Sequence, residues 1–103
     1  MKIPLIFAIS LNVTLVHAQS VDASAGETLY VDACAQCHGS TGRGNMGLPS
    51  LAGNDANYIA SRLKHYRACG KVGGSSSMMI SNAADLSDAD IANLAAFIST
   101  RFR

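Results

Sequence analysis

The most reactive side chains of this sequence lie in five consecutive residues, Cys34-Ala35-Gln36-Cys37-His38. Two cysteines separated by two residues and followed directly by histidine form the attachment signature of a c-type haem. Each thiol can add across a vinyl group of the haem, and the histidine is then held under the iron, where it can act as an axial ligand. The motif therefore predicts one covalent haem, bound through Cys34 and Cys37, with His38 as a metal ligand.

A structural zinc site is the alternative that these side chains leave open. Together with Cys69, the residues Cys34, Cys37 and His38 provide four nitrogen and sulfur ligands, the kind of set that structural zinc sites use. However, Cys37 and His38 are adjacent, which makes a common tetrahedral site awkward. A strong Soret absorption band would indicate haem, whereas a colourless protein would contradict the haem interpretation.

Methionine is a candidate ligand for the other side of the iron, where its soft thioether would favour Fe(II) and raise the reduction potential. Met46 lies only eight residues after His38 and is expected to make an apolar or rim contact. Met78 and Met79 both follow a Gly/Ser-rich segment, residues 70–77, from which a ligand on the far side must come. Residue type alone does not distinguish Met78 from Met79 as the ligand.

Two other side chains could bind a metal but have simpler interpretations. His65 would give a second histidine ligand and a lower potential. It lies off the apolar stripe of its helix and is predicted to be exposed. Cys69 is a thiol that haem attachment does not use. Three interpretations stay open for it: a small buried side chain, which is favoured, a disulfide with another chain, and a redox or metal ligand.

The first 18 residues resemble a cleaved secretory signal peptide. Met1-Lys2 supplies a positive charge, residues 3–16 are mostly apolar, and Val16-His17-Ala18 ends the run with small residues at the positions a signal peptidase reads. The run is too short for a membrane span, although an uncleaved anchor is the alternative, and no later segment is apolar enough to span. We expect cleavage after Ala18 and an exported mature chain, residues 19–103, which is periplasmic in a Gram-negative bacterium.

Charge and size limit what the mature chain can do. The whole chain has eight Lys and Arg against seven Asp and Glu, and loss of Lys2 leaves the two signs balanced. Neither a strongly charged docking face nor nucleic-acid binding is therefore predicted. A single domain of this size buries little apolar surface on its own, and a large apolar cofactor at its centre would compensate for that.

Apolar periodicity predicts three main helices and no strand. The first spans residues 21–33, and the second begins after Asn54-Asp55 and ends near Ala68. The third begins with Ser87-Asp88-Ala89-Asp90, an acidic variant of the capping box. The connections at 39–53 and 70–77 are rich in glycine and are predicted to be loops.

Four blocks of residues, in this order and spacing, resemble a small bacterial class I cytochrome c. They cover about residues 26–98 and are Cys34-Ala35-Gln36-Cys37-His38-Gly39, Leu48-Pro49-Ser50-Leu51-Ala52-Gly53, Met78-Met79, and Leu86-Ser87-Asp88-Ala89-Asp90-Ile91. The resemblance implies an all-α class I cytochrome c fold, with three main helices and loops wrapped around one covalently bound haem.

The resemblance also implies roles for single residues. The carbonyl of Pro49 would accept a hydrogen bond from His38, and the spacing to Leu86 would make Met79 the sixth ligand rather than Met78. Gly26 and Tyr30 would cross Leu94 and Phe97 between the first and last helices. The candidates to line the haem pocket are Leu51, Tyr58, Ile59, Leu63 and Ile80.

One-electron transfer is the function that these residues predict. With both axial positions filled by the protein, the iron offers no substrate site, so an exported electron carrier is expected rather than an enzyme. Its partners would be a redox donor and a redox acceptor. The alternative is a permanent haem subunit beside a flavoprotein, as in flavocytochrome c sulfide dehydrogenase, taking electrons from the flavin.

Overall fold

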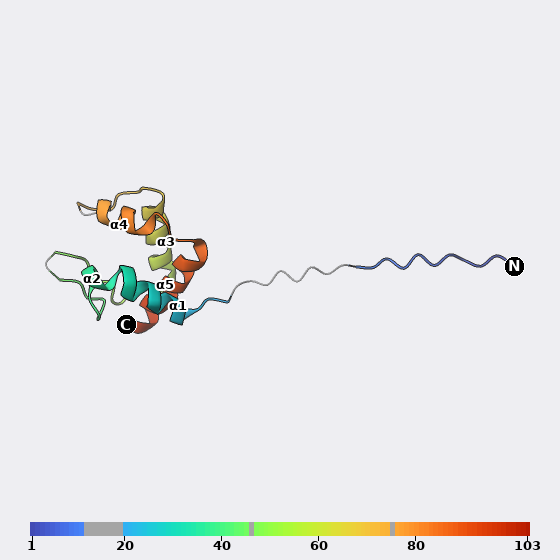
Figure 1. Cartoon of the computed structure of the whole chain (residues 1–103), viewed down its shortest axis with the longest axis horizontal. Coiled ribbons are helices and arrows are strands. Elements are labelled where there is room, and N and C mark those ends of the chain that lie inside the picture. The colour runs from blue at the N-terminus through green and yellow to red at the C-terminus, as the bar shows by residue number, and fades with distance from the viewer. Residues whose placement is uncertain (12–19, 46, 75) are drawn as a thin grey trace.

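The chain folds into helices only, within the residues that its computed structural model describes, which are 1–11, 20–45, 47–74 and 76–103 (Figure 1). The helices are α1 (Ala23–Ala33), α2 (Ala35–His38), α3 (Ala56–Arg67), α4 (Ser76–Ala83) and α5 (Asp88–Arg101). The all-α prediction is thus confirmed. Residues 1–11 are exposed and have no secondary structure. The expected cleavage site after Ala18 and the contact expected of Met46 lie outside the described residues.

Local capping explains why the three predicted helices begin where they do. Asp22 accepts hydrogen bonds from the backbone N–H groups of Ser24 and Ala25, so α1 begins two residues later than predicted. The Asp55 carboxylate accepts from the N–H of Tyr58 at 2.7 Å and starts α3. These caps satisfy N–H groups that have no partner within the helix.

The capping box predicted at the start of α5 is present in both directions. The Asp90 N–H donates to the Ser87 hydroxyl at 3.0 Å, and the Ser87 N–H donates to the Asp90 carboxylate at 3.0 Å. Asp88 also lies in the first turn and Arg101 in the last, where the helix dipole favours these charges.

Helix α4 was not predicted, and the loop predicted over residues 70–77 ends two residues early. The helix has only eight residues, Ser-Ser-Met-Met-Ile-Ser-Asn-Ala, and four of them are serine or asparagine, which are poor helix formers. Its first and last residues, Ser76 and Ala83, are both buried. Packing against α3 therefore stabilises this helix more than its own propensity does.

The core lies where α5 packs against α1 and α3. A Cβ atom at Gly26 would collide with the backbone carbonyl of Asn93, so a glycine is required for the close approach of α1 and α5. One turn later the ring of Tyr30 packs 5.5 Å from the ring of Phe97, centroid to centroid. The predicted crossing of α1 and α5 is confirmed. The buried apolar residues of this core are Tyr30, Ile59, Leu63, Ile91, Leu94, Ala95, Phe97, Ile98 and Phe102.

Gly26→Ala is expected to destabilise the protein, although alanine is the better helix former. The added methyl group has no space against a backbone atom, so α1 and α5 must separate. Such overpacking lowers the free energy of unfolding by about 1–3 kcal/mol, and each kcal/mol lowers Tm by about 4–8 °C in a domain of this size. Thermal unfolding of the holoprotein measures the effect.

Gly73→Ala is the matched control for this substitution, because a Cβ at Gly73 meets no atom within 4 Å. It should leave Tm nearly unchanged. Equal Tm values for Gly26→Ala and the wild type would contradict the role of Gly26 in the helix crossing.

A second link joins α3 to the start of α5. The guanidinium of Arg67 donates to the Leu86 carbonyl at 3.0 Å and to the Asp88 carboxylate at 2.7 Å. The hydrogen bond from Arg67, its charge, and to a smaller extent the charge of Lys64 hold the pKa of Asp88 below its usual value. Arg67 therefore fixes the junction between two helices of the core. Throughout the part of the chain that the structure describes, no helix is long and apolar enough to cross a membrane.

Candidate functional site

The short helix α2 brings the three side chains of the attachment motif into one turn. The Cys34 carbonyl accepts from the N–H groups of Cys37 at 3.2 Å and His38 at 2.9 Å. Gly39 ends the turn with a φ of 85°, a conformation that glycine adopts without strain. Both thiols are partly buried and neither is in a disulfide. Burial, followed by the nearby Cys37, raises the pKa of the Cys34 thiol to about 11.

His38 is the one buried imidazole among the described residues, with 6% of its surface exposed. Its Nδ1 atom lies 3.0 Å from the carbonyl oxygen of Pro49. Because a carbonyl oxygen can only accept, Nδ1 carries the proton and Nε2 keeps a free lone pair. A metal-binding histidine needs this arrangement, and the hydrogen bond also makes the imidazole a stronger base. The Pro49 carbonyl thus lies within hydrogen-bond distance of His38, the contact that the resemblance implied.

The loop that carries Pro49 is held by its own backbone. The N–H of Leu51 donates to the Gly42 carbonyl at 2.6 Å, and the N–H of Gly44 donates to the His38 carbonyl at 2.8 Å. A Cβ at Gly44 would collide with the Leu48 carbonyl and would crowd that of Pro49. The glycines of this loop therefore allow the backbone to fold closely beside His38.

Tyr30 connects the core to the attachment motif. Its hydroxyl donates to the Gly39 carbonyl at 2.6 Å. Burial, followed by the proximity of Cys34, raises the pKa of Tyr30 to about 12, so the hydroxyl stays protonated and remains a donor. Sequence reasoning assigned Tyr30 to the helix crossing alone, because nothing in its local pattern reveals a bond to a residue nine positions away.

Helix α4 presents its two methionines differently. Residues three or four apart share a face of a helix, and Ser76, Met79 and Ala83 form such a series. Ser76 and Ala83 are buried, and Met79 is partly buried against the core. Met78 has 51% of its surface exposed. In Figure 1, α4 and α2 extend toward the same side of the molecule, away from residues 1–11.

Ser76 fixes the segment that leads into α4. Its hydroxyl accepts from the N–H groups of Val72 and Gly73, both at 2.8 Å. Sequence reasoning missed this residue, because a serine in a Gly/Ser-rich segment gives no local signal of burial.

The residues expected to line a haem pocket are not all placed alike. Ile59 and Leu63 are buried in the core, while Leu51 packs against it and Ile80 is partly buried. Tyr58 is 46% exposed, and the guanidinium of Arg62 lies 5.2 Å from the centroid of its ring. The structure therefore groups Leu51, Ile59 and Leu63 with the core and leaves Tyr58 at the surface.

Comparison with known proteins decides the family. A family model described as cytochrome c matches residues 23–101. The chain belongs to the cytochrome c family. Covalently bound haem c and electron transfer by that haem follow from this membership, and the cysteines of the attachment motif are present at 34 and 37. The haem interpretation of the motif is thereby confirmed, and the donor set described above, a buried imidazole with a free Nε2 beside two thiols, fits the group.

Individual relatives agree with the family. Cytochrome c-554(548) of Halomonas halodenitrificans is 41% identical over 81 residues, which cover 78% of this chain and 96% of the relative. Cytochrome c-554(547) of Halothiobacillus neapolitanus is 39% identical over 87 residues, covering 77% of this chain and 96% of the relative.

A solved structure has the same fold. Reduced recombinant cytochrome c4 from Pseudomonas stutzeri superposes with a TM-score of 0.68 and 33% identity, covering 82% of this chain and 53% of that one. The chain thus spans about half the length of that cytochrome c4, and nearly all of the c-554 relatives. The expected class I cytochrome c fold is confirmed.

The structure contradicts one favoured interpretation and one alternative, and both concern Cys69. Cys69 is exposed, at a φ of 65° just beyond α3, so the favoured interpretation as a buried side chain is wrong. The described residues hold no group of three or more His, Cys, Asp or Glu able to bind a metal, so the zinc interpretation with Cys69 is also wrong. His65 is exposed as expected, with its ring against Gly70.

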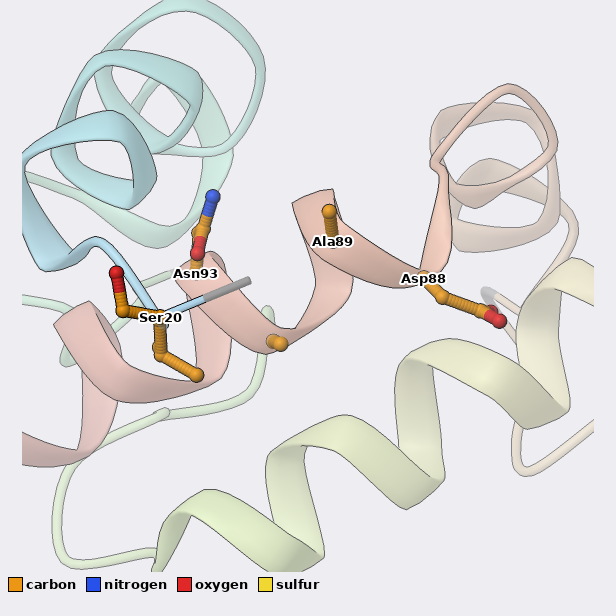
Figure 2. Close-up of a pocket in the computed structure, with 6 residues that line it drawn as sticks. Ser20, Asp88, Ala89 and Asn93 are labelled. Atoms are coloured by element: carbon orange, nitrogen blue, oxygen red, sulfur yellow. The ribbon is translucent and has the colours of Figure 1, made fainter. Parts of the chain in front are cut away.

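A hollow on the surface of the cytochrome lies apart from the attachment motif. Figure 2 shows it between the segment at Ser20 and the first half of α5, with Asp88, Ala89 and Asn93 along one side. Its labelled side chains do not converge on a common point. The N–H of Asp22 donates to Asn93 at 2.8 Å and ties the start of α1 to α5 beside this hollow. The hollow therefore marks the boundary between two elements, and none of the expected haem-binding residues lines it.

Proposed function

We propose that this cytochrome c is an exported one-electron carrier whose iron is bound by His38 and Met79. When bound, the haem supplies an iron centre that alternates between Fe(II) and Fe(III). The observation that carries the proposal is the buried His38, whose Nδ1 is occupied by the Pro49 carbonyl while Nε2 remains free. Cys34 and Cys37 would hold the porphyrin by thioether bonds.

Met79 is the proposed sixth ligand, and its place on the inward face of α4 supports it over Met78. Leu51 is proposed to pack against the haem, which its partial burial beside the core supports. Tyr58 remains a predicted haem contact.

A carrier needs no substrate site, and two protein ligands on the iron would leave none. We therefore propose that the protein is not an enzyme and works between a redox donor and a redox acceptor, in contacts that bury little surface. The c-554 relatives are matched by this chain over nearly their whole length. This supports a carrier over a subunit of a flavoprotein. We further propose that residues 1–18 are a signal peptide and that residues 19–103 are one domain.

Purification of the protein from the periplasm of an expressing cell tests this function. The holoprotein should begin at Gln19, show a Soret band with sharp bands on reduction, and titrate as a one-electron couple. The reduced protein should not bind carbon monoxide, because its sixth position is filled. Rapid carbon monoxide binding or a flavin in the purified complex would contradict the proposed carrier.

A further inference from the structure

The last aromatic residue of the chain lies beside the loop that holds the proximal histidine. Phe102 follows α5, has 5% of its surface exposed, and donates its N–H to the Ile98 carbonyl at 3.1 Å. Its ring packs against the rings of Tyr30 and Phe97, at centroid distances of 5.1 and 5.6 Å. Phe102 is therefore packed firmly against the aromatic residues of the core.

Phe102 also makes two contacts with the loop that carries Pro49. Its ring fills the space that a Cβ atom would take at Gly42, a buried residue with a φ of 67°. Its carbonyl accepts from the N–H of Gly53 at 2.8 Å. Gly42 and Gly53 lie on either side of Pro49 in the sequence, so both arms of the loop are fixed to one residue of the core.

Two hydrogen bonds link Gly42 to the proximal ligand, His38. The Gly42 carbonyl accepts from the N–H of Leu51 at 2.6 Å, and Leu51 is two residues from Pro49. The Pro49 carbonyl in turn lies 3.0 Å from Nδ1 of His38. A displacement of Gly42 would therefore move the acceptor of the His38 hydrogen bond.

From these contacts we infer that Phe102 is a positioning residue for the proximal ligand. It sets the hydrogen bond between His38 and Pro49 through Gly42. The inference rests on the proposed function, in which His38 binds the iron. Since the hydrogen bond makes the imidazole a stronger base, it favours Fe(III), and weakening it should raise the reduction potential.

Phe102→Leu in the holoprotein tests the inference, with Phe97→Leu as the matched control. Both substitutions remove a buried ring from the same aromatic cluster, whereas the ring that fills the space at Gly42 belongs to Phe102. Two quantities are measured: the exchange rate of the His38 Nδ1 proton by NMR of the reduced protein, and the reduction potential. Thermal unfolding reports the general loss of stability.

Phe102→Leu should exchange the Nδ1 proton about tenfold faster, which corresponds to roughly 1.4 kcal/mol of easier local opening, and should raise the potential. Phe97→Leu should lower Tm by a similar amount while changing the exchange rate and the potential much less, because the Phe102 ring at Gly42 stays in place. If Phe102→Leu does not retain haem, Phe102→Met, which fills irregular space better, replaces it.

Equal exchange rates and potentials in the two variants would overturn the inference, since both rings would then act only through packing. A failure of the proposed function gives a different result. In that case the wild-type protein itself would lack the NMR signals of an iron-bound His38, and both proposals would fall together. Wild-type ligation with an unchanged Phe102→Leu variant overturns the role of Phe102 alone.

Discussion

Replacement of both Cys34 and Cys37 by serine should give a chain that retains no haem after denaturation and does not fold. The two thiols are the only atoms of the attachment motif that can form covalent bonds to the porphyrin. Without those bonds, the apolar surface intended for haem is exposed to water in a domain that buries little surface of its own. The loss in the free energy of unfolding should exceed ~5 kcal/mol, which is the lower end of the stability range of small domains.

Two measurements check this result on the secreted protein. Haem absorption after acid denaturation reports covalent attachment, and far-UV circular dichroism reports the helices. Cys69→Ser is the matched control, because Cys69 is the third cysteine and is exposed away from the core. It should keep haem, helical content and Tm. A double serine variant that is folded and stable without haem would contradict the dependence of this fold on its cofactor.

The features of this fold that could be predicted are those encoded within a few residues. Asp55 caps α3, and Ser87 forms the capping box of α5 with Asp90, so each cap depends only on positions three residues apart. The attachment motif is local in the same sense, since one short turn brings Cys34, Cys37 and His38 together. Local encoding is why these parts agree with the structure.

The parts that could not be predicted depend on distant contacts. Helix α4 forms because its inward face packs on α3, and nothing in its own eight residues indicates that neighbour. Cys69 was expected to be buried on the general tendency of its residue type, but the chain turns outward directly after α3 and exposes it. The contacts of Tyr30 with Gly39 and of Phe102 with Gly42 join residues that are 9 and 60 positions apart.

The second large expected effect concerns the proposed sixth ligand, Met79, which lies on helix α4. Met79→Ala should remove the weak long-wavelength charge-transfer band of a methionine bound to Fe(III). It should also lower the reduction potential, because a thioether favours Fe(II). A shift on the order of 0.1 V is expected, within the roughly 0.8 V range that axial ligands span. The absorption spectrum of the oxidised protein and a redox titration measure these two quantities.

Met78→Ala is the natural control, because it removes the same side chain one position earlier. The half-exposed Met78 lies on the outward face of α4, so its loss should leave the band and the potential nearly unchanged. The reverse result, with the band lost in Met78→Ala and kept in Met79→Ala, would mean that α4 turns its other face to the iron once haem is bound. Because Ser76 and Ala83 are both buried on the same face as Met79, that rotation would have to expose Ser76 and break its two bonds to the backbone of the preceding loop. The burial of Ser76 therefore favours Met79 on grounds independent of its spacing to Leu86.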